Sequence, residues 1–256
     1  MVFEVEVFKV FLLVVVRFSG LIMTAPVIGS RNFPTTAKIG LVGLTAMLIT
    51  PAIGRLDTPI PDDAVGFALY GMGELLIGIV IGFVMTLTFA AIQVAGQILD
   101  MMSGFSLINV FNPALETQVP IFGFFLFLLA ALYLLVLDAH HLMIRALAAS
   151  FETIPLGGFQ ANPALLWEVS SWGRAMFYDG IMIAAPAVGA LLLAYLTMGL
   201  LSRLIPQVHL FVVGFPVTIA MALLLVAISL TAYLSLLDGM FERMFENVGT
   251  AIRGMA

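Results

Sequence analysis

The chain has 256 residues, of which 62% are hydrophobic and only 10% charged, and its formal net charge is −5. A soluble domain carries about 25% charged residues, so this composition cannot cover a water-exposed surface. The acidic balance without basic runs excludes a nucleic-acid-binding surface, and the absence of cysteine excludes disulfides and thiol catalysis. An all-α, polytopic helical membrane protein is the class that fits this composition.

Six apolar segments are the candidates for crossing a membrane. About 20 apolar residues span the roughly 30 Å of bilayer hydrocarbon, so we predict about six long hydrophobic helices. As one helix the third segment would reach about 54 Å, so it either protrudes from the bilayer or breaks. In chain order the segments are Val10–Ile28, Ile39–Ile53, Ala64–Leu99, Val119–Leu137, Met176–Leu201 and Leu210–Leu237.

The longest connection, Asp138–Gly173, has mixed composition. We expect a helix over His141–Phe151 and a turn at Pro155–Gly158. Asn162 and Pro163 are then typical of the N-cap and first position of another, short helix.

The last two apolar segments are joined by the short turn Ser202–His209. They are therefore predicted to form an antiparallel hairpin, and each contains a proline, Pro186 or Pro216. A kinked helix is tolerated in a membrane where neighbouring helices satisfy the freed carbonyl. The tail Asp238–Ala256 has apolar residues at helical spacing, which predicts an amphipathic interfacial or packing helix.

Two charged residues, Arg17 and Glu74, lie inside apolar segments. A charge at the bilayer centre costs about 2.5–3.5 kcal/mol on insertion scales, so each needs a partner. We expect them to pair with each other or to face another subunit, as a structural tie; a conduction or proton role is the alternative. Glu74, Gly78 and Gly82 share one helix face, which forms a Gly-x-x-x-Gly groove typical of close helix contacts. We expect this face to pack on a partner subunit.

The chain offers little enzyme chemistry. Asp138, His140 and His141 cluster in sequence, but there is no His-Glu-x-x-His pattern, so hydrogen bonding at a membrane interface is favoured over a metal site. No serine lies in a Gly-x-Ser-x-Gly motif and no Walker-type loop is present. We therefore predict no catalytic residues, no cofactor and no metal ligands.

A series of short motifs runs along the whole chain. The most specific is Arg-x-x-Pro-Gln-x-x-x-Phe-x-x-Gly-Phe-Pro, which begins at Arg203. With it the chain resembles the FliR family of the flagellar export apparatus, whose injectisome counterparts are the SctT proteins. His209 and Asn112 depart from the family pattern, which has Asn and Asp there. Further motifs of the resemblance include Arg17-Phe18-Ser19-Gly20, Ala25-Pro26, Glu74 with Gly78 and Gly82, Asn112-Pro113, and His140-His141.

The resemblance implies a subunit of the export gate in the bacterial inner membrane and flagellar basal body. Such a gate contains FliP-like and FliQ-like subunits and one chain of this kind, in about five, four and one copies, with an FlhB-like subunit associated. Unfolded export substrates pass through its pore, and membrane lipid surrounds it. The injectisome is the alternative setting, and a small-molecule carrier or channel is the alternative function, because carriers also use paired, broken helices.

The resemblance also implies an internal division of the chain. Residues 1–175 would form a FliP-like helical portion, residues 176–237 a FliQ-like helical hairpin, and residues 238–256 the amphipathic tail. This agrees with the change in character from long separate segments to one tight, proline-containing hairpin.

The linker Asp100–Gln118 is expected to be the pore plug. It is apolar yet bounded by turn formers, and a loop at membrane depth is tolerated only when it is buried in protein or lines a cavity. An apolar constriction seals a pore by excluding water, and in the resembling family a loop at this position blocks the channel. A hydrophobic loop wedged permanently between helices is the alternative. The plug residues are Gly104, Phe105, Leu107, Ile108, Val110, Phe111 and Pro113.

The tip of the hairpin is expected at the cytoplasmic mouth of the gate, or else to be a turn capped by its own side chains. The tip residues are Arg203, Pro206, Gln207, His209 and Phe211. The positive-inside rule favours the opposite orientation, because three loop cations lie on the side of the tip and six on the other; we adopt the family orientation. The three are Arg31, Lys38 and Arg203, and the six are Lys9, Arg55, Arg145, Arg174, Arg243 and Arg253.

Overall fold

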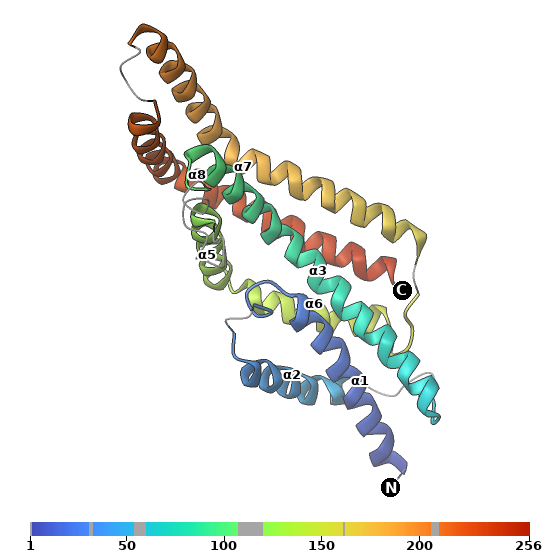
Figure 1. The fold of residues 1–256 in the computed structure, drawn as a ribbon. Coiled ribbons are helices and arrows are strands. Elements are labelled where there is room, and N and C mark those ends of the chain that lie inside the picture. The colour runs from blue at the N-terminus through green and yellow to red at the C-terminus, as the bar shows by residue number, and fades with distance from the viewer. Residues whose placement is uncertain (1, 31–32, 54–59, 107–119, 161, 206–209) are drawn as a thin grey trace. The chain divides into compact units, whose positions relative to one another are not determined.

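The computed structural model describes residues 2–30, 33–53, 60–106, 120–160, 162–205 and 210–256. Within these ranges the chain is mostly helical and contains no strands, which confirms the all-α prediction (Figure 1). The elements are α1 (Val2–Thr24), α2 (Thr35–Ile49) with the short 3-10 helix η1 (Thr50–Ala52), α3 (Ala64–Ser103), α5 (Ile121–Val136), α6 (Ala139–Thr153), α7 (Pro163–Leu204) and α8 (Leu210–Gly254).

Five regions are long and apolar enough to cross a bilayer in the described part of the chain. They lie in α1, in α2 with η1, and in α3, α7 and α8, while α5 and α6 pass the same test together as one bent pair. The prediction of about six hydrophobic helices in a polytopic membrane protein is confirmed.

The third segment is a single α-helix of 40 residues, Ala64–Ser103. At about 1.5 Å per residue it is about 60 Å long, roughly twice the hydrocarbon thickness. The alternative of a broken segment is therefore wrong, because no proline lies within this stretch to interrupt the helix.

Two helices extend further than predicted. The amide of Ala164 donates to Asn162 Oδ1 at 2.9 Å, so the N-cap is as predicted, but the helix continues to Leu204 instead of being short. The tail likewise continues α8 to Gly254. Neither Pro186 nor Gly239 stops its helix, since a proline kink can be accommodated when neighbouring groups satisfy the freed carbonyl.

The described chain folds into two compact units. The first comprises Met1–Thr88, Leu134–Gly173 and Phe241–Ala256. Its core includes apolar side chains of α1, α3 and α6 together with the apolar face of the tail, so the tail is a packing helix. Buried members are Leu13, Val14, Phe18, Ile77, Ile81, Met143, Leu147, Phe241, Met244 and Val248.

The second unit comprises Phe89–Tyr133 and Arg174–Met240. Its core contains Phe89, Ile92, Leu126, Leu191 and Ala222. The ring of Phe89 meets Phe127 edge to face, with centroids 5.6 Å apart.

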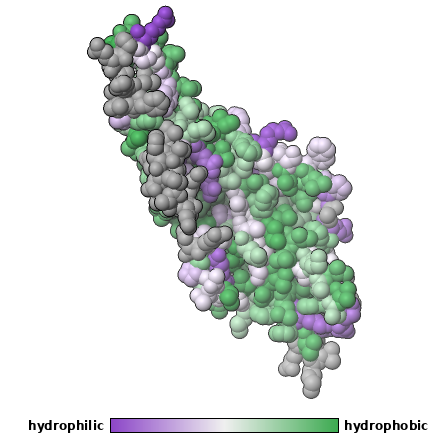
Figure 2. All heavy atoms as spheres, in the orientation of Figure 1, coloured by the Kyte–Doolittle hydropathy of each residue, from purple (hydrophilic) through white to green (hydrophobic). Residues whose placement is uncertain are grey.

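Apolar side chains also cover much of the face shown in Figure 2. Large hydrophobic residues are exposed on α2, α7 and α8, among them Ile39, Leu44, Leu48, Leu192, Leu193, Leu196, Leu224 and Ile228. A soluble monomer rarely exposes contiguous apolar patches of this kind. These helices therefore face lipid or other membrane-embedded protein.

Candidate functional site

A buried ion pair lies inside the first unit. Arg17 Nε of α1 is 2.5 Å from Glu74 Oε2 of α3, and both side chains are fully buried. The two charged residues found in apolar segments thus pair with each other within the chain. Such a pair fixes which helices lie side by side, because separating the partners would leave an uncompensated charge.

The other nitrogens of the Arg17 guanidinium are held by α6 and the residue that follows it. Nη1 donates to Ser150 Oγ at 3.0 Å, and Nη2 donates to the carbonyl of Ile154 at 3.1 Å. The guanidinium also lies 3.9 Å from the centroid of the Phe151 ring. Arg17 therefore joins three helices, and each of its three guanidinium nitrogens donates a hydrogen bond, as a buried charge requires.

Glu74 has a second partner in the turn after α6. The amide of Gly157 donates to Glu74 Oε1 at 2.9 Å. Gly157 has φ of 75°, and the amide of Gly158 donates to the carbonyl of Pro155 at 2.9 Å, so the predicted turn is confirmed. A side chain at Gly157 would both strain the backbone and collide with the ring of Tyr70.

The glycine face of α3 packs on α1 of the same chain. A Cβ atom on Gly78 would collide with the α1 backbone, lying 3.0 Å from Gly20 Cα and 2.9 Å from the Leu21 amide nitrogen. A Cβ on Gly82 would lie 2.8 Å from the carbonyl oxygen of Leu21. The expectation that this face contacts a partner subunit is wrong, because α1 already occupies the groove.

We expect Gly78→Leu to destabilise the first unit by more than the about 1–3 kcal/mol usual for overpacking, because the leucine meets rigid backbone rather than side chains. The matched control is Gly71→Leu, seven residues earlier on α3, where an added Cβ meets nothing within 4 Å. Thermal unfolding of the purified chain in detergent measures both. Equal melting temperatures would contradict the packing argument.

An exposed ion pair joins α1 to the turn before α3. Lys9 Nζ is 2.5 Å from Asp62 Oδ1, and the Asp62 side chain is 99% exposed. The hydrogen bond and charge of Lys9 hold the pKa of the Asp62 carboxyl below its ordinary value. Solvent screens such a pair, so it contributes little to stability.

Asp100 caps the start of α5, a role that the sequence analysis missed. Its carboxylate is buried and accepts hydrogen bonds from the amides of Phe122 at 3.1 Å and Gly123 at 3.3 Å. A carboxylate at a helix N-terminus satisfies free amides and complements the helix dipole. Pro120, directly before α5, marks a helix start in the sequence, but nothing there identifies Asp100 as its partner.

The end of α3 is tied to both helices of the C-terminal hairpin. Tyr195 of α7 donates its hydroxyl to the carbonyl of Met102 at 2.8 Å, and Thr218 of α8 donates to the carbonyl of Ser103 at 2.9 Å. The last four carbonyls of a helix lack intrahelical partners, and leaving them unpaired is costly in an apolar environment. We call Tyr195 and Thr218 the hydroxyl clamp.

The first residues of the predicted plug directly follow the end of α3 that the hydroxyl clamp holds. Gly104 has φ of 93°, and a Cβ there would lie 2.8 Å from Cδ1 of Phe215, in the Gly-Phe-Pro motif. The ring of Phe105 meets that of Phe122 edge to face at 5.5 Å. The remaining plug residues, Leu107, Ile108, Val110, Phe111 and Pro113, lie outside the described residues.

The hydroxyl clamp is expected to stabilise the second unit measurably. Replacing Tyr195 by Phe and Thr218 by Val removes two hydrogen bonds with little change in volume, at about 1 kcal/mol for each bond. The control is Thr197→Val, since the Thr197 hydroxyl donates to the Leu193 carbonyl of its own helix at 2.8 Å and to no other group among the described residues. Chemical denaturation of the purified chain in detergent compares the variants. A double variant no less stable than the control would show that the clamp contributes nothing.

The predicted hairpin tip is described only in part. Arg203 is exposed in the last turn of α7, where a cation is favourable at the negative end of the helix dipole. Phe211 lies in the first turn of α8. Pro206, Gln207 and His209 lie outside the described residues, so the place of the tip at a pore mouth stays a prediction.

Long apolar helices, buried charges paired within the chain and exposed apolar faces define a polytopic helical membrane protein. Residues 8–244 match the family described as bacterial export proteins, family 1. The chain belongs to this family, that of FliR, and the resemblance found in its motifs is confirmed.

Relatives from several bacteria are similar to this chain over most of their length. The flagellar biosynthetic protein FliR of Escherichia coli strain K12 is 32% identical over 231 residues, covering 90% of this chain and 87% of the relative. FliR of Bacillus subtilis strain 168 is 30% identical over 249 residues, covering 95% of each. FliR of Pectobacterium carotovorum is 34% identical over 234 residues, covering 90% and 88%.

Proposed function

We propose that this chain is a subunit of the flagellar protein export gate in the bacterial inner membrane. The observation that carries the proposal is the end-to-end similarity to flagellar biosynthetic proteins, which reaches 95% of both chains for the B. subtilis relative. The family of bacterial export proteins gives the class of activity, and the long apolar helices fit a membrane-embedded gate.

We further propose that the chain assembles as one copy with about five FliP-like and four FliQ-like subunits, with an FlhB-like subunit beside them. In this assembly, residues 1–175 would form the FliP-like portion, residues 176–237 would form the FliQ-like hairpin and residues 238–256 would form the tail. Support comes from burial: only 17% of the most apolar stretch of α7 and 22% of that of α8 is buried within the chain, against 50% for α3. Helices this exposed have surface available for neighbouring subunits.

In this proposal the segment 100–118 closes the pore, and unfolded export substrates displace it. The described part of the segment supports an anchored start: the hydroxyl clamp holds the end of α3, and Gly104 and Phe105 pack on aromatic rings. The sealing itself is assigned to the apolar side chains that follow. No catalytic residue or cofactor enters this function.

The proposed assembly is tested by measuring the mass and subunit composition of the purified complex. The chain carries an affinity tag, is expressed with its FliP-like and FliQ-like partners, and is purified in mild detergent for native mass spectrometry. One copy of this chain with several copies of each partner would support the gate. A monomer or a homo-oligomer without those partners would instead favour a small-molecule carrier or channel.

The orientation of the hairpin has its own test. Since the natural chain has no cysteine, Arg203→Cys and His209→Cys each introduce a unique thiol. We expect a membrane-impermeant thiol reagent to label both positions in inverted membrane vesicles and neither in intact spheroplasts. Labelling from the outside would overturn the cytoplasmic placement of the tip and would favour the orientation given by the loop cations.

A further inference from the structure

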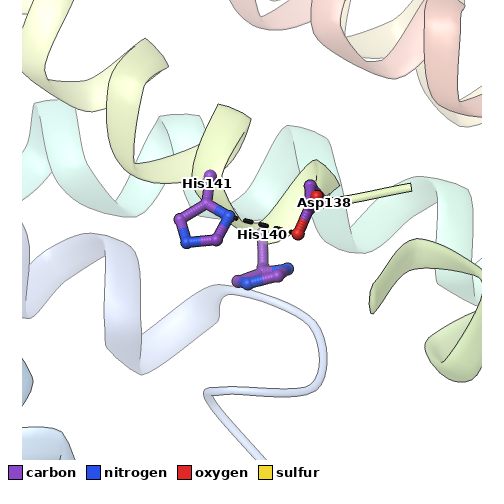
Figure 3. A group of neighbouring side chains, drawn as sticks. All are labelled: Asp138, His140 and His141. Carbon is purple, nitrogen blue, oxygen red and sulfur yellow. Dashed lines mark ion pairs between the residues drawn. The ribbon is translucent and has the colours of Figure 1, made fainter. Parts of the chain in front are cut away.

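Three side chains of types that can bind metal ions lie together at the start of α6, within the first unit (Figure 3). They are Asp138, directly before the helix, and His140 and His141 in its first turn. One potential ligand atom of each lies within 4.8 Å of those of the other two. His141 Nδ1 is 3.4 Å from Asp138 Oδ1, and the two imidazole rings lie with their centroids 4.0 Å apart.

We propose that Asp138, His140 and His141 bind a divalent transition-metal ion of the zinc class. Two imidazole nitrogens and one carboxylate oxygen form a donor set that suits zinc, with the fourth position left to water. Ligands at about 2.0–2.2 Å from a tetrahedral ion lie about 3.4 Å from one another, which is the Asp138–His141 separation. The other separations are at most 4.8 Å, so binding requires the ligand atoms to approach one another by less than about 1.5 Å.

The backbone before α6 makes the third ligand available. Asp138 has φ of 54°, a left-handed conformation that is uncommon for a residue other than glycine. Its side chain makes no capping hydrogen bond to the helix it precedes, and its carboxylate lies instead beside His141. The sequence favoured hydrogen bonding over a metal site because no His-Glu-x-x-His pattern is present, whereas this turn supplies a ligand from outside the helix.

His140 adds an independent observation. Its Nδ1 is buried and has no hydrogen-bond partner among the described residues. A buried polar atom left unpaired costs about 1–3 kcal/mol, whereas a metal ion accepts the lone pair of a neutral imidazole. A ring flip exchanges Nδ1 with Cδ2 and Nε2 with Cε1, so the ring can present a nitrogen on either of its two edges.

The site is open on the side of the other two ligands. The side chains of Asp138 and His141 are 77% and 61% exposed, so an ion can reach them without opening the fold. A bound ion would fix the turn before α6 to the first turn of the helix. The opposite end of α6 holds Arg17 through Ser150 and the carbonyl of Ile154, so the ion would stabilise the helix that completes the buried charge site.

The test uses the detergent-purified gate complex, or the full chain alone if it is stable, with an affinity tag that contains no histidine. The sample is stripped with a chelator and titrated with Co²⁺, whose visible absorption reports tetrahedral nitrogen and oxygen coordination, and Zn²⁺ is then added as competitor. We expect one Co²⁺ per chain and its displacement by Zn²⁺. X-ray absorption of the zinc-loaded sample should show two imidazole ligands.

The variants His140→Ala, His141→Ala and Asp138→Asn should each weaken binding at least about tenfold, since even outer-sphere partners change affinity by 10–100-fold. Glu152→Gln, an exposed carboxylate at the other end of α6, is the matched control and should leave binding unchanged. Unaltered binding in all three variants would mean an adventitious ion only. No stoichiometric binding by the natural sequence would overturn the proposal without any variant, and neither result depends on the export function.

Discussion

Replacing Glu74 by glutamine is expected to destabilise the first unit by about 3–5 kcal/mol. Arg17 would remain fully buried without its counter-charge, and breaking a buried pair by removing one partner carries this cost. A loss of this size approaches the whole stability of many domains. We therefore expect much less folded chain in the membrane and a clearly lower melting temperature in detergent. Glu168→Gln, which removes an exposed carboxylate on α7, should change stability by no more than about 0.5 kcal/mol.

A double variant distinguishes the stability cost of an unpaired buried charge from a functional role of the Arg17–Glu74 pair in export. Arg17→Met with Glu74→Leu replaces both partners by apolar side chains, and replacing a buried pair in this way is often neutral or stabilising. We expect this variant to recover most of the stability lost in Glu74→Gln. If the recovered protein also supports export, the pair is a structural tie. A stable double variant that fails to export would favour the conduction or proton role, and no recovery at all would contradict the electrostatic argument.

The buried charges show what the sequence could and could not predict. A charge inside an apolar segment requires a partner, so the need of Arg17 and Glu74 for partners followed from their positions in the sequence. Their other contacts come from Ser150, Ile154 and Gly157, far along the chain, and no local pattern records such pairings. Local rules predict the need for a partner, whereas tertiary packing selects which residue meets it.

The glycine face of α3 likewise predicted a contact without identifying the helix that makes it. Gly78 and Gly82 correctly indicated a close helix contact, because only glycine lets two backbones approach so nearly. The spacing says nothing about whether the neighbouring helix belongs to the same chain, and the neighbour is α1. The two ends of α7 also differed in how well the sequence predicted them. Asn162 predicted the start of the helix, whereas no residue before Leu204 marked its end.

Turns outside regular structure were the least predictable. The turn at Pro155–Gly158 carried clear sequence markers and is confirmed. The left-handed Asp138 carried none, since aspartate adopts many conformations. Asp100 was treated only as the boundary of a linker, yet it caps α5 across that linker. A cap that is distant in sequence cannot be recognised from local residue preferences.

Deleting Ser106–Asn112 is expected to make cells leak ions and small solutes while the gate still assembles. The deletion removes the apolar side chains Leu107, Ile108, Val110 and Phe111, to which we assign the seal. A conduit wide enough for a polypeptide conducts water and ions unless an apolar constriction excludes them. The hydroxyl clamp and the Asp100 cap lie outside the deletion, so the second unit should still fold. Solute efflux from cells that produce the complete gate is the measurement.

A substitution tests the chemistry of the seal without shortening the chain. Leu107→Asp with Val110→Asp places charges in the constriction, where they hold water in the pore, and should leak as the deletion does. Leu107→Met with Val110→Ile keeps the segment apolar at similar volume and should stay tight. Co-purification of the FliP-like and FliQ-like partners establishes that each variant is assembled. An assembled gate that remains tight with both aspartates, or after the deletion, would show that this segment is a hydrophobic loop wedged between helices and that the seal lies elsewhere.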